Sequence, residues 1–383
     1  MRLVKLLSTI LVVALLLPLA GCGPKPGSST IRIGVIAPLT GDVKTFGESV
    51  KNSSQLAIDE WNAKGGIMGK QIELVPADDK NDAAEASAAA TKLINQDGIK
   101  FLVGAVTSKC AIPVSEIANE AKVVDISPTS TNPKLTVDPW PGGKRKEYVF
   151  RSCFIDPFQG SAMANFALNT LKIQKAAVLY DNGNDYTKGL AEYFRDGFTK
   201  GGGTINVYEA YSKDDTDFSA LLTKVIADNP DMLYIPDYYN MVNLIAKQAR
   251  AAGFKGILAG GDGWDSSDLD FAATDGGYFT NHYSPDDPRP EVQNWVKTYQ
   301  AKFGKAPDAL GTLAYDATNL LLNAIKTANS EDTAKVKDAL AATKDYQAVT
   351  GNLSFDQDGN PVKDITVLQV SGGKVKLITT IKP

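Results

Sequence analysis

Histidine, paired cysteines and basic charge are scarce in this 383-residue chain, and each shortage excludes a class of function. The single histidine, His282, and the lack of a Cys-x-x-Cys pair leave no ligand set for a structural or catalytic metal. A lone histidine also argues against a catalytic triad. The formal charge of −4 lacks the basic excess that a nucleic-acid-binding surface needs. We therefore expect no metal, no cofactor and no nucleic-acid partner.

Two nucleotide-binding motifs are also missing from the start of the chain. The segment from Gly41 to Gly47 is followed by Glu48, not by the lysine that a P-loop requires. No Gly-x-Gly-x-x-Gly turn follows the first predicted strand. These absences favour a binding protein over an enzyme.

The N-terminal residues have the pattern of an export signal. Arg2 and Lys5 precede an apolar stretch, 6–20, that is shorter than the ~20 residues needed to span a bilayer. The stretch ends at Leu19-Ala20-Gly21-Cys22, which resembles a bacterial lipobox. That resemblance implies a lipoprotein signal peptide over 1–21 and acylation of Cys22. A plain signal peptide with an unrelated cysteine is the alternative.

The predicted mature chain begins with a lipid-anchored tether, 22–30, rich in glycine, proline and serine. Loss of the signal peptide removes two basic residues and changes the formal charge from −4 to −6, which favours solubility. We expect an extracytoplasmic protein, at the cell surface or in the periplasm, whose only contact with the membrane is its lipid.

Two cysteines remain in this oxidising environment, Cys110 and Cys153. We predict a disulfide between them, which would close a loop of about 43 residues and stabilise the fold by roughly 4 kcal/mol. Two separate buried thiols are the alternative.

Apolar runs alternate with amphipathic segments from Ile31 onward. In the first half we predict strands at 31–37, 71–76, 101–106 and 123–126, and helices at 47–63, 83–95 and 111–121. In the second half we predict strands at 176–180, 232–236 and 257–260, and helices at 188–200, 218–228 and 241–252. The repeated order predicts an α/β fold with two doubly wound lobes, each a parallel sheet with helices on both faces.

The last third of the chain has too few strands for a third sheet. We predict that helices at 291–303, 313–328 and 333–342 cover the first lobe, and that strands at 352–355, 365–370 and 375–381 join the second. The chain would then cross between the lobes three times, near 153–157, 282–285 and 353–357, and form a hinge. The expected division is 31–154 plus 283–352 for the N-terminal lobe and 155–282 plus 353–383 for the C-terminal lobe.

Candidate binding residues follow the predicted strands, where open parallel sheets bind their ligands. In the first lobe, loops at 40–47, 107–109 and 127–133 offer hydroxyls and backbone N–H groups, one of them at a helix start that suits a carboxylate. In the second lobe, loops at 181–186, 236–239 and 260–265 offer aromatic rings and an acid, which suit an ammonium group on an apolar chain. Ordinary caps and tight turns are the alternative in both lobes.

Five segments of the chain are characteristic when taken together, namely Trp61-Asn62-Ala63-Lys64-Gly65-Gly66-Ile67, Ile126-Ser127-Pro128-Thr129-Ser130-Thr131-Asn132-Pro133, Asp217-Phe218-Ser219-Ala220-Leu221, Lys247-Gln248-Ala249-Arg250 and Gly261-Asp262-Gly263. With these segments the chain resembles the branched-chain amino-acid (Leu/Ile/Val) binding proteins of bacterial ABC importers, which are type I periplasmic binding proteins. The resemblance implies a monomer that captures an aliphatic amino acid by hinge closure and delivers it to the permease subunits of an importer. Amides, urea or aromatic acids as cargo, or a role as a ligand sensor, are the alternatives.

The resemblance also implies a set of ligand-binding residues. They are Phe46, Ser108, Thr129, Ser130, Thr131, Tyr186, Tyr238, Asp262 and Trp264. Ser108 and Thr131 would hold the ligand carboxylate, with help from backbone N–H groups. The Thr129 carbonyl and the Asp262 carboxylate would hold the ammonium group.

The remaining residues of the set would line the pocket for the ligand side chain. Phe46, Tyr186 and Tyr238 (or its neighbour Tyr239) would form its walls, with Trp264 close by. Three substitutions distinguish this chain from the family pattern. A phenylalanine replaces the usual tyrosine at 46, Thr-Ser replaces two common alanines at 129–130, and an aspartate replaces a longer glutamate at 262. The side-chain preference therefore stays open.

Overall fold

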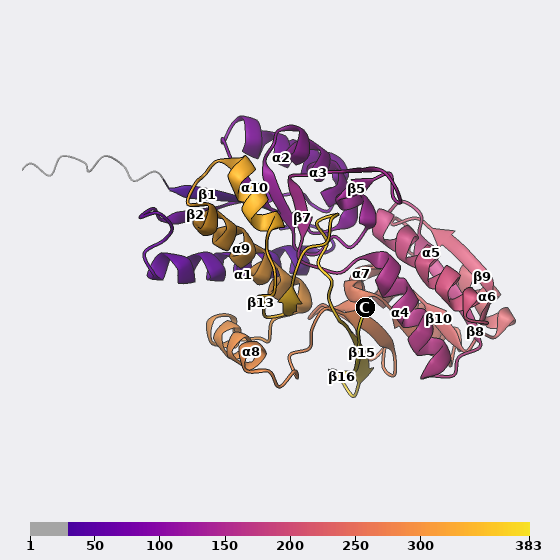
Figure 1. Ribbon diagram of the computed structural model, residues 1–383. Coiled ribbons are helices and arrows are strands. Elements are labelled where there is room, and N and C mark those ends of the chain that lie inside the picture. Colours follow the sequence, from indigo (N-terminus) through magenta and orange to yellow (C-terminus); the bar gives the residue numbers. More distant parts are fainter. Residues whose placement is uncertain (1–29) are drawn as a thin grey trace, which may run out of the picture.

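The computed structural model describes residues 30–383. The predicted signal peptide and the predicted lipidation site, Cys22, lie outside the described residues. The described chain forms two α/β lobes, each built on its own sheet. In Figure 1 the indigo and purple elements belong to the first lobe, and the pink elements belong to the second. No helix within 30–383 is long and apolar enough to cross a bilayer.

The first sheet has five parallel strands with β1 near its centre. The order is β2 (Ile72–Asp78), β1 (Ile31–Ala37), β3 (Phe101–Val103), β4 (Val124–Ser127) and β7 (Val149–Arg151). Nearly every residue of β1 is buried, as expected of a strand covered on both faces. Helices α2 (Ala83–Asn95) and α3 (Ser108–Glu120) pack together on one face, and α1 (Lys44–Ala63) covers the other.

The second sheet repeats the strand order of the first. Its parallel part runs β9 (Thr204–Tyr211), β8 (Lys175–Asp181), β10 (Met232–Tyr234), β11 (Ile257–Gly260) and β12 (Tyr278–Asn281). Its helices are α4 (Asp156–Asn169), α5 (Asp185–Lys200), α6 (Ser219–Asp228) and α7 (Tyr239–Ala251). Two antiparallel strands extend it beyond β12, namely β15 (Ile365–Ser371) and β16 (Lys374–Ile381). The prediction of two doubly wound lobes is confirmed.

The last third of the chain is shared between the lobes. It contains α8 (Pro290–Phe303), α9 (Ala309–Ala328) and α10 (Thr333–Ala341), followed by the hairpin β13 (Tyr346–Ala348) and β14 (Gly351–Leu353). Helix α9 packs along α1 and α10 packs on α9, so orange helices lie among the indigo ones in Figure 1. The chain therefore passes between the sheets after β7, after β12 and after β14.

A buried lysine joins the first and third of these crossovers. The Lys363 ammonium group donates to the Ser152 carbonyl at 3.0 Å and to the Thr350 hydroxyl. Burial lowers the pKa of Lys363 to about 8, against the opposing effect of the nearby Asp316 carboxylate. Asp316 in turn accepts the backbone N–H groups of Val349 and Thr350. The crossovers thus form one connected hinge.

The predicted disulfide between Cys110 and Cys153 is wrong, because both are free, buried thiols. Cys110 lies on α3 in the apolar cluster between α2, α3 and the first sheet. Cys153 lies in the first crossover, where its thiol donates to the Ser130 carbonyl at 3.2 Å. Burial raises the pKa of both thiols to about 12. Both therefore stay protonated and unreactive at neutral pH.

We expect a fragment spanning residues 30–383 to contain two thiols that are masked by folding. A thiol-specific chromogenic reagent at pH 7.5 should modify neither thiol in the folded protein, and both in denaturant without reductant. The melting temperature should also be the same with and without reductant, since no cross-link contributes to stability. An unreduced, denatured sample in which neither thiol reacts would contradict the assignment.

Candidate functional site

A small cavity lies between the lobes, at the loops that follow the strands of both sheets. It encloses about 280 Å³ including its mouth. Its lining residues are Phe46, Val106, Thr107, Ser108, Thr129 and Leu310 from the first lobe, and Tyr186, Tyr238, Asp262 and Gly263 from the second. The lining combines apolar side chains, hydroxyl groups and one carboxylate.

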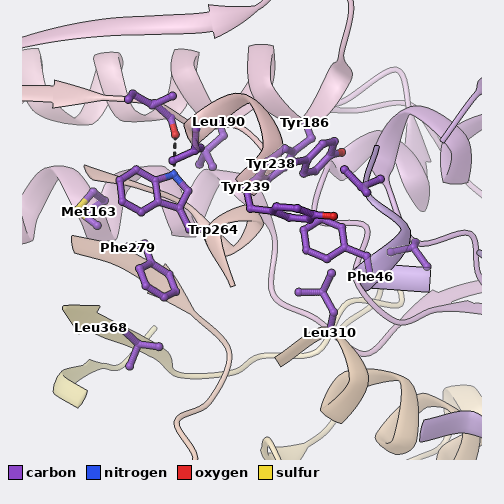
Figure 2. Close-up of a cluster of buried hydrophobic side chains, with 14 of the residues drawn as sticks. Phe46, Met163, Tyr186, Leu190, Tyr238, Tyr239, Trp264, Phe279, Leu310 and Leu368 are labelled. Carbon is purple, nitrogen blue, oxygen red and sulfur yellow. Dashed lines mark hydrogen bonds between the residues drawn. The ribbon is translucent and has the colours of Figure 1, made fainter. Parts of the chain in front are cut away.

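Aromatic rings from both lobes form one wall of the cavity. The rings of Tyr186 and Tyr238 stack with centroids 5.3 Å apart and an interplanar angle of 4°. Phe46 of α1 meets Tyr238 edge-to-face at 5.8 Å and 84°. Figure 2 shows these rings together, with Leu310 of α9 just below Phe46 in the view. The apolar surface of the cavity is complete only when the two lobes meet.

The charged end of the cavity is Asp262, on the short helix η2 (Asp262–Trp264) after β11. One carboxylate oxygen, Oδ1, accepts Gln159 Nε2–H at 2.8 Å and the Tyr186 hydroxyl at 2.9 Å. The other, Oδ2, lies 3.0 Å from His282 Nε2. A carboxylate offers about four acceptor positions, so these three donors leave one for a ligand. The side chain lines the cavity although the residue is only 5% exposed.

The glycine that precedes Asp262 makes this network possible. A Cβ atom at Gly261 would lie 2.6 Å from the Tyr186 hydroxyl and 2.9 Å from Gln159 Nε2. Both distances are shorter than any normal contact of a methyl group. Glycine at 261 therefore lets the two donors reach the carboxylate side by side.

The part of the cavity lined by the first lobe is uncharged and rich in donors. Ser108 is the first residue of α3, and Thr107 is its N-cap, so the helix N-terminus faces the cavity. Ser108 Oγ accepts the Asn132 backbone N–H at 3.3 Å and the Ser130 hydroxyl at 3.2 Å. The Thr129 hydroxyl donates to the Val106 carbonyl at 2.6 Å. This part of the lining can hold an anionic group with backbone and hydroxyl donors.

Three of the predicted residues do not reach the cavity. Trp264 is fully buried in the core of the second lobe, and its indole N–H donates to the Ile235 carbonyl at 2.9 Å. Figure 2 shows it between Met163 and Phe279, apart from Phe46. Ser130 and Thr131 are fully buried and do not line the cavity. The structure therefore brings together six of the nine predicted residues.

Four residues of the site lie outside the predicted loops. Val106 and Leu310 line the cavity, and Gln159 and His282 contact Asp262 from behind it. Leu310 lies in the first turn of α9, three residues before the predicted helix start. The sequence gives no sign that Val106, Gln159 and His282 belong to the site, because the residues they contact are distant along the chain.

The lobes touch one another at the rim of the cavity. The Tyr239 hydroxyl donates to the Asp42 carbonyl at 3.1 Å, and the hydroxyls of Thr45 and Ser266 are 3.0 Å apart. These contacts join the two lobes beside the aromatic wall. The two lobes are therefore in direct contact beside the cavity that lies between them.

Two lobes of one topology, a hinge of three crossovers and a cavity completed by closure define a hinged binding protein. The chain belongs to the periplasmic binding protein family, whose profile matches residues 30–374.

Several relatives resemble the whole described chain. The Leu/Ile/Val-binding protein homolog 3 of Brucella melitensis is 35% identical over 334 residues, which cover 86% of this chain and 88% of that protein. The leucine-binding protein LivK of Thermotoga maritima is 36% identical with a TM-score of 0.87, covering 92% of this chain and 99% of that one. LivJ of Streptococcus pneumoniae, in complex with isoleucine, is 35% identical with a TM-score of 0.86, covering 93% and 100%.

We expect Tyr186→Phe to destabilise the protein, because it removes one donor to a buried carboxylate and leaves the Gly263 N–H without its acceptor. The loss should be about 1–3 kcal/mol in the free energy of unfolding, measured by urea titration. The matched control is Tyr234→Phe, since the buried Tyr234 hydroxyl has no hydrogen-bond partner among the described residues. Equal effects of the two substitutions would show that the Tyr186 hydroxyl does not support Asp262.

Proposed function

We propose that this protein is the extracytoplasmic solute-binding component of an ABC importer, and that it captures an aliphatic amino acid between its lobes. The observation that carries the proposal is the polarity of the cavity. The donor-rich N-terminus of α3 at Ser108 lines the cavity from the first lobe, the Asp262 carboxylate lines it from the second, and apolar side chains complete the lining. The relatives named as Leu/Ile/Val-binding proteins support the same ligand class.

A free amino acid matches both the donor-rich lining of the first lobe and the carboxylate of the second. Burying its two charges costs several kcal/mol each unless each charge finds a partner. The α-carboxylate would accept backbone N–H groups at the start of α3 and the Ser108 hydroxyl. The α-ammonium group would donate to the remaining acceptor position of Asp262 and to the Thr129 carbonyl. Charge-assisted hydrogen bonds of this kind contribute about 1.5–3 kcal/mol each.

The apolar side chain of the ligand would pack on Phe46, Tyr238 and Leu310. Each buried methylene contributes ~0.8 kcal/mol, and adding or removing one changes the binding free energy by only ~1–3 kcal/mol. We therefore propose broad selectivity among leucine, isoleucine and valine. Neutral amides and aromatic acids lack an ammonium group, so they would leave the buried Asp262 without a cation.

Closing of the lobes would hold the ligand, and their reopening would release it. Each lobe supplies only part of the site, so the ligand binds the closed conformation more tightly than the open one and shifts the population toward it. The hinge would reopen when the permease subunits bind the loaded protein. The protein would act as a monomer that carries out no chemistry on its ligand.

Substitution of Asp262 tests the amino-acid clamp directly. Asp262→Ala should weaken the binding of L-isoleucine by about 10- to 150-fold in isothermal titration, the loss expected for a charged hydrogen bond. Asp268→Ala, on the exposed part of the same loop, should leave the affinity unchanged. Since ligands raise the melting temperature of a protein that binds them, a thermal-shift screen of amino acids, amides and benzoate identifies the ligand class. Stabilisation by amides alone would refute the proposed cargo.

We further propose that Cys22 carries the lipid that holds the protein at the membrane. Cells fed an alkyne-labelled fatty acid should incorporate the label into the wild-type protein and not into Cys22→Ser. The substituted protein should also move from the membrane fraction to the soluble fraction, because its membrane contact is lost. If the wild-type protein does not incorporate the label, the N-terminal segment is a plain signal peptide and Cys22 carries no lipid.

A further inference from the structure

We propose that Gln159 and His282 are positioning residues for Asp262, and that a proton on His282 competes with the ligand ammonium group for the same carboxylate. The proposal rests on the proposed capture of an ammonium-bearing ligand at Asp262. It adds that the affinity depends on pH through the only histidine of the chain.

The His282 imidazole is held by groups from two crossovers and one loop. It follows β12 in the second crossover, and its ring stacks on Phe154 of the first crossover with centroids 3.7 Å apart and an angle of 24°. Its side chain is fully buried, and Nε2 lies 3.0 Å from Asp262 Oδ2. An ionised carboxylate only accepts hydrogen bonds, so the geometry assigns the proton to Nε2. Nδ1 is buried without a hydrogen-bond partner among the described residues.

Gln159 fixes the other carboxylate oxygen. Its amide nitrogen donates to Asp262 Oδ1 at 2.8 Å and to the Thr280 hydroxyl at 2.9 Å, and the side chain is fully buried on α4. Thr280 lies on β12, two residues before His282. One short segment of the second lobe thus orients both positioning side chains. The carboxylate keeps a single orientation toward the cavity.

The protonation state of the imidazole decides whether Asp262 is available. A neutral His282 leaves one negative charge on Asp262 for one ligand ammonium group. A protonated His282 neutralises that charge by forming a buried ion pair. The ligand ammonium group would then face a cation on the far side of the same carboxylate. Protonation therefore weakens binding, and by linkage bound ligand makes protonation harder.

The charges around the imidazole set the direction of the effect. Burial lowers the pKa of His282 below its ordinary 6.5, Asp262 opposes this, and the buried ammonium group of Lys363 lowers it further. Other titratable groups also act on Asp262, namely Asp156, Asp265, Cys153, Tyr186, Tyr234 and Tyr238. His282 is thus neutral at pH 7. The affinity is full there and falls as the pH drops through the pKa of the unliganded protein.

Titration calorimetry with L-isoleucine between pH 5 and pH 8 tests the proposal. The wild-type affinity should fall as the pH drops below the ordinary imidazole range, by up to the about 5- to 150-fold that is typical of coupled sites. H282Q keeps an N–H donor that cannot titrate, so its affinity should change less over the same range. The other titrating carboxyls and Lys363 remain in H282Q, so the difference between the profiles reports the imidazole alone. H282L removes the donor and should bind more weakly than H282Q at pH 8.

A measurement on the unsubstituted protein decides the question even if H282Q does not fold. Without a histidine tag, the protein gives one imidazole resonance in a ¹H–¹³C spectrum. Its pKa should be lower with saturating isoleucine than without ligand. An equal or higher pKa with isoleucine, or identical pH profiles for wild type and H282Q, would overturn the proposal for His282. Failure of the wild type to bind any amino acid at pH 7.5 would instead refute the proposed function.

Discussion

A carboxylate buried between two lobes needs donors to remain charged, and this requirement organises the site. Asp262 receives hydrogen bonds from α4, α5 and the segment after β12, and Gly261 leaves room for two of these donors. The desolvation of an unpaired carboxylate would cost several kcal/mol, so each donor is part of the stability of the second lobe. Stability and ligand binding therefore depend on the same few side chains.

Much of the fold follows from local patterns in the sequence. The strands at 31–37 and 257–260 and the helix at 83–95 have the predicted bounds, because their apolar spacing and flanking residues are unambiguous. Helix α4 was missed because its alanines, glycine and phenylalanines lie on all sides of the helix. It therefore lacks the polar stripe that marks an amphipathic helix. The strands β7, β9 and β12 were also missed. β7 and β12 have only three and four residues, and apolar runs of that length give no clear period.

The site was predictable where a residue lies directly after a strand. Ser108, Tyr238 and Asp262 line the cavity because parallel strands present their carboxyl ends at one edge. Further along the same loops the prediction fails, because side chains that are close in the sequence of a tight turn can point in opposite directions. Trp264 lies two residues after Asp262 yet belongs to the core. The disulfide failed for a similar reason, because spacing along the chain does not reveal which way two thiols point.

The interleaved topology has a consequence for biogenesis. Helix α9 completes the first lobe and strands β15 and β16 complete the second, although both come from the last fifth of the sequence. Neither lobe can complete its folding before the end of the chain has been synthesised and has crossed the membrane. Until β15 arrives, β12 presents an open strand edge, the kind of surface that promotes aggregation. A premature stop codon near the 3′ end of the gene would therefore damage the middle of the protein, not just its tail.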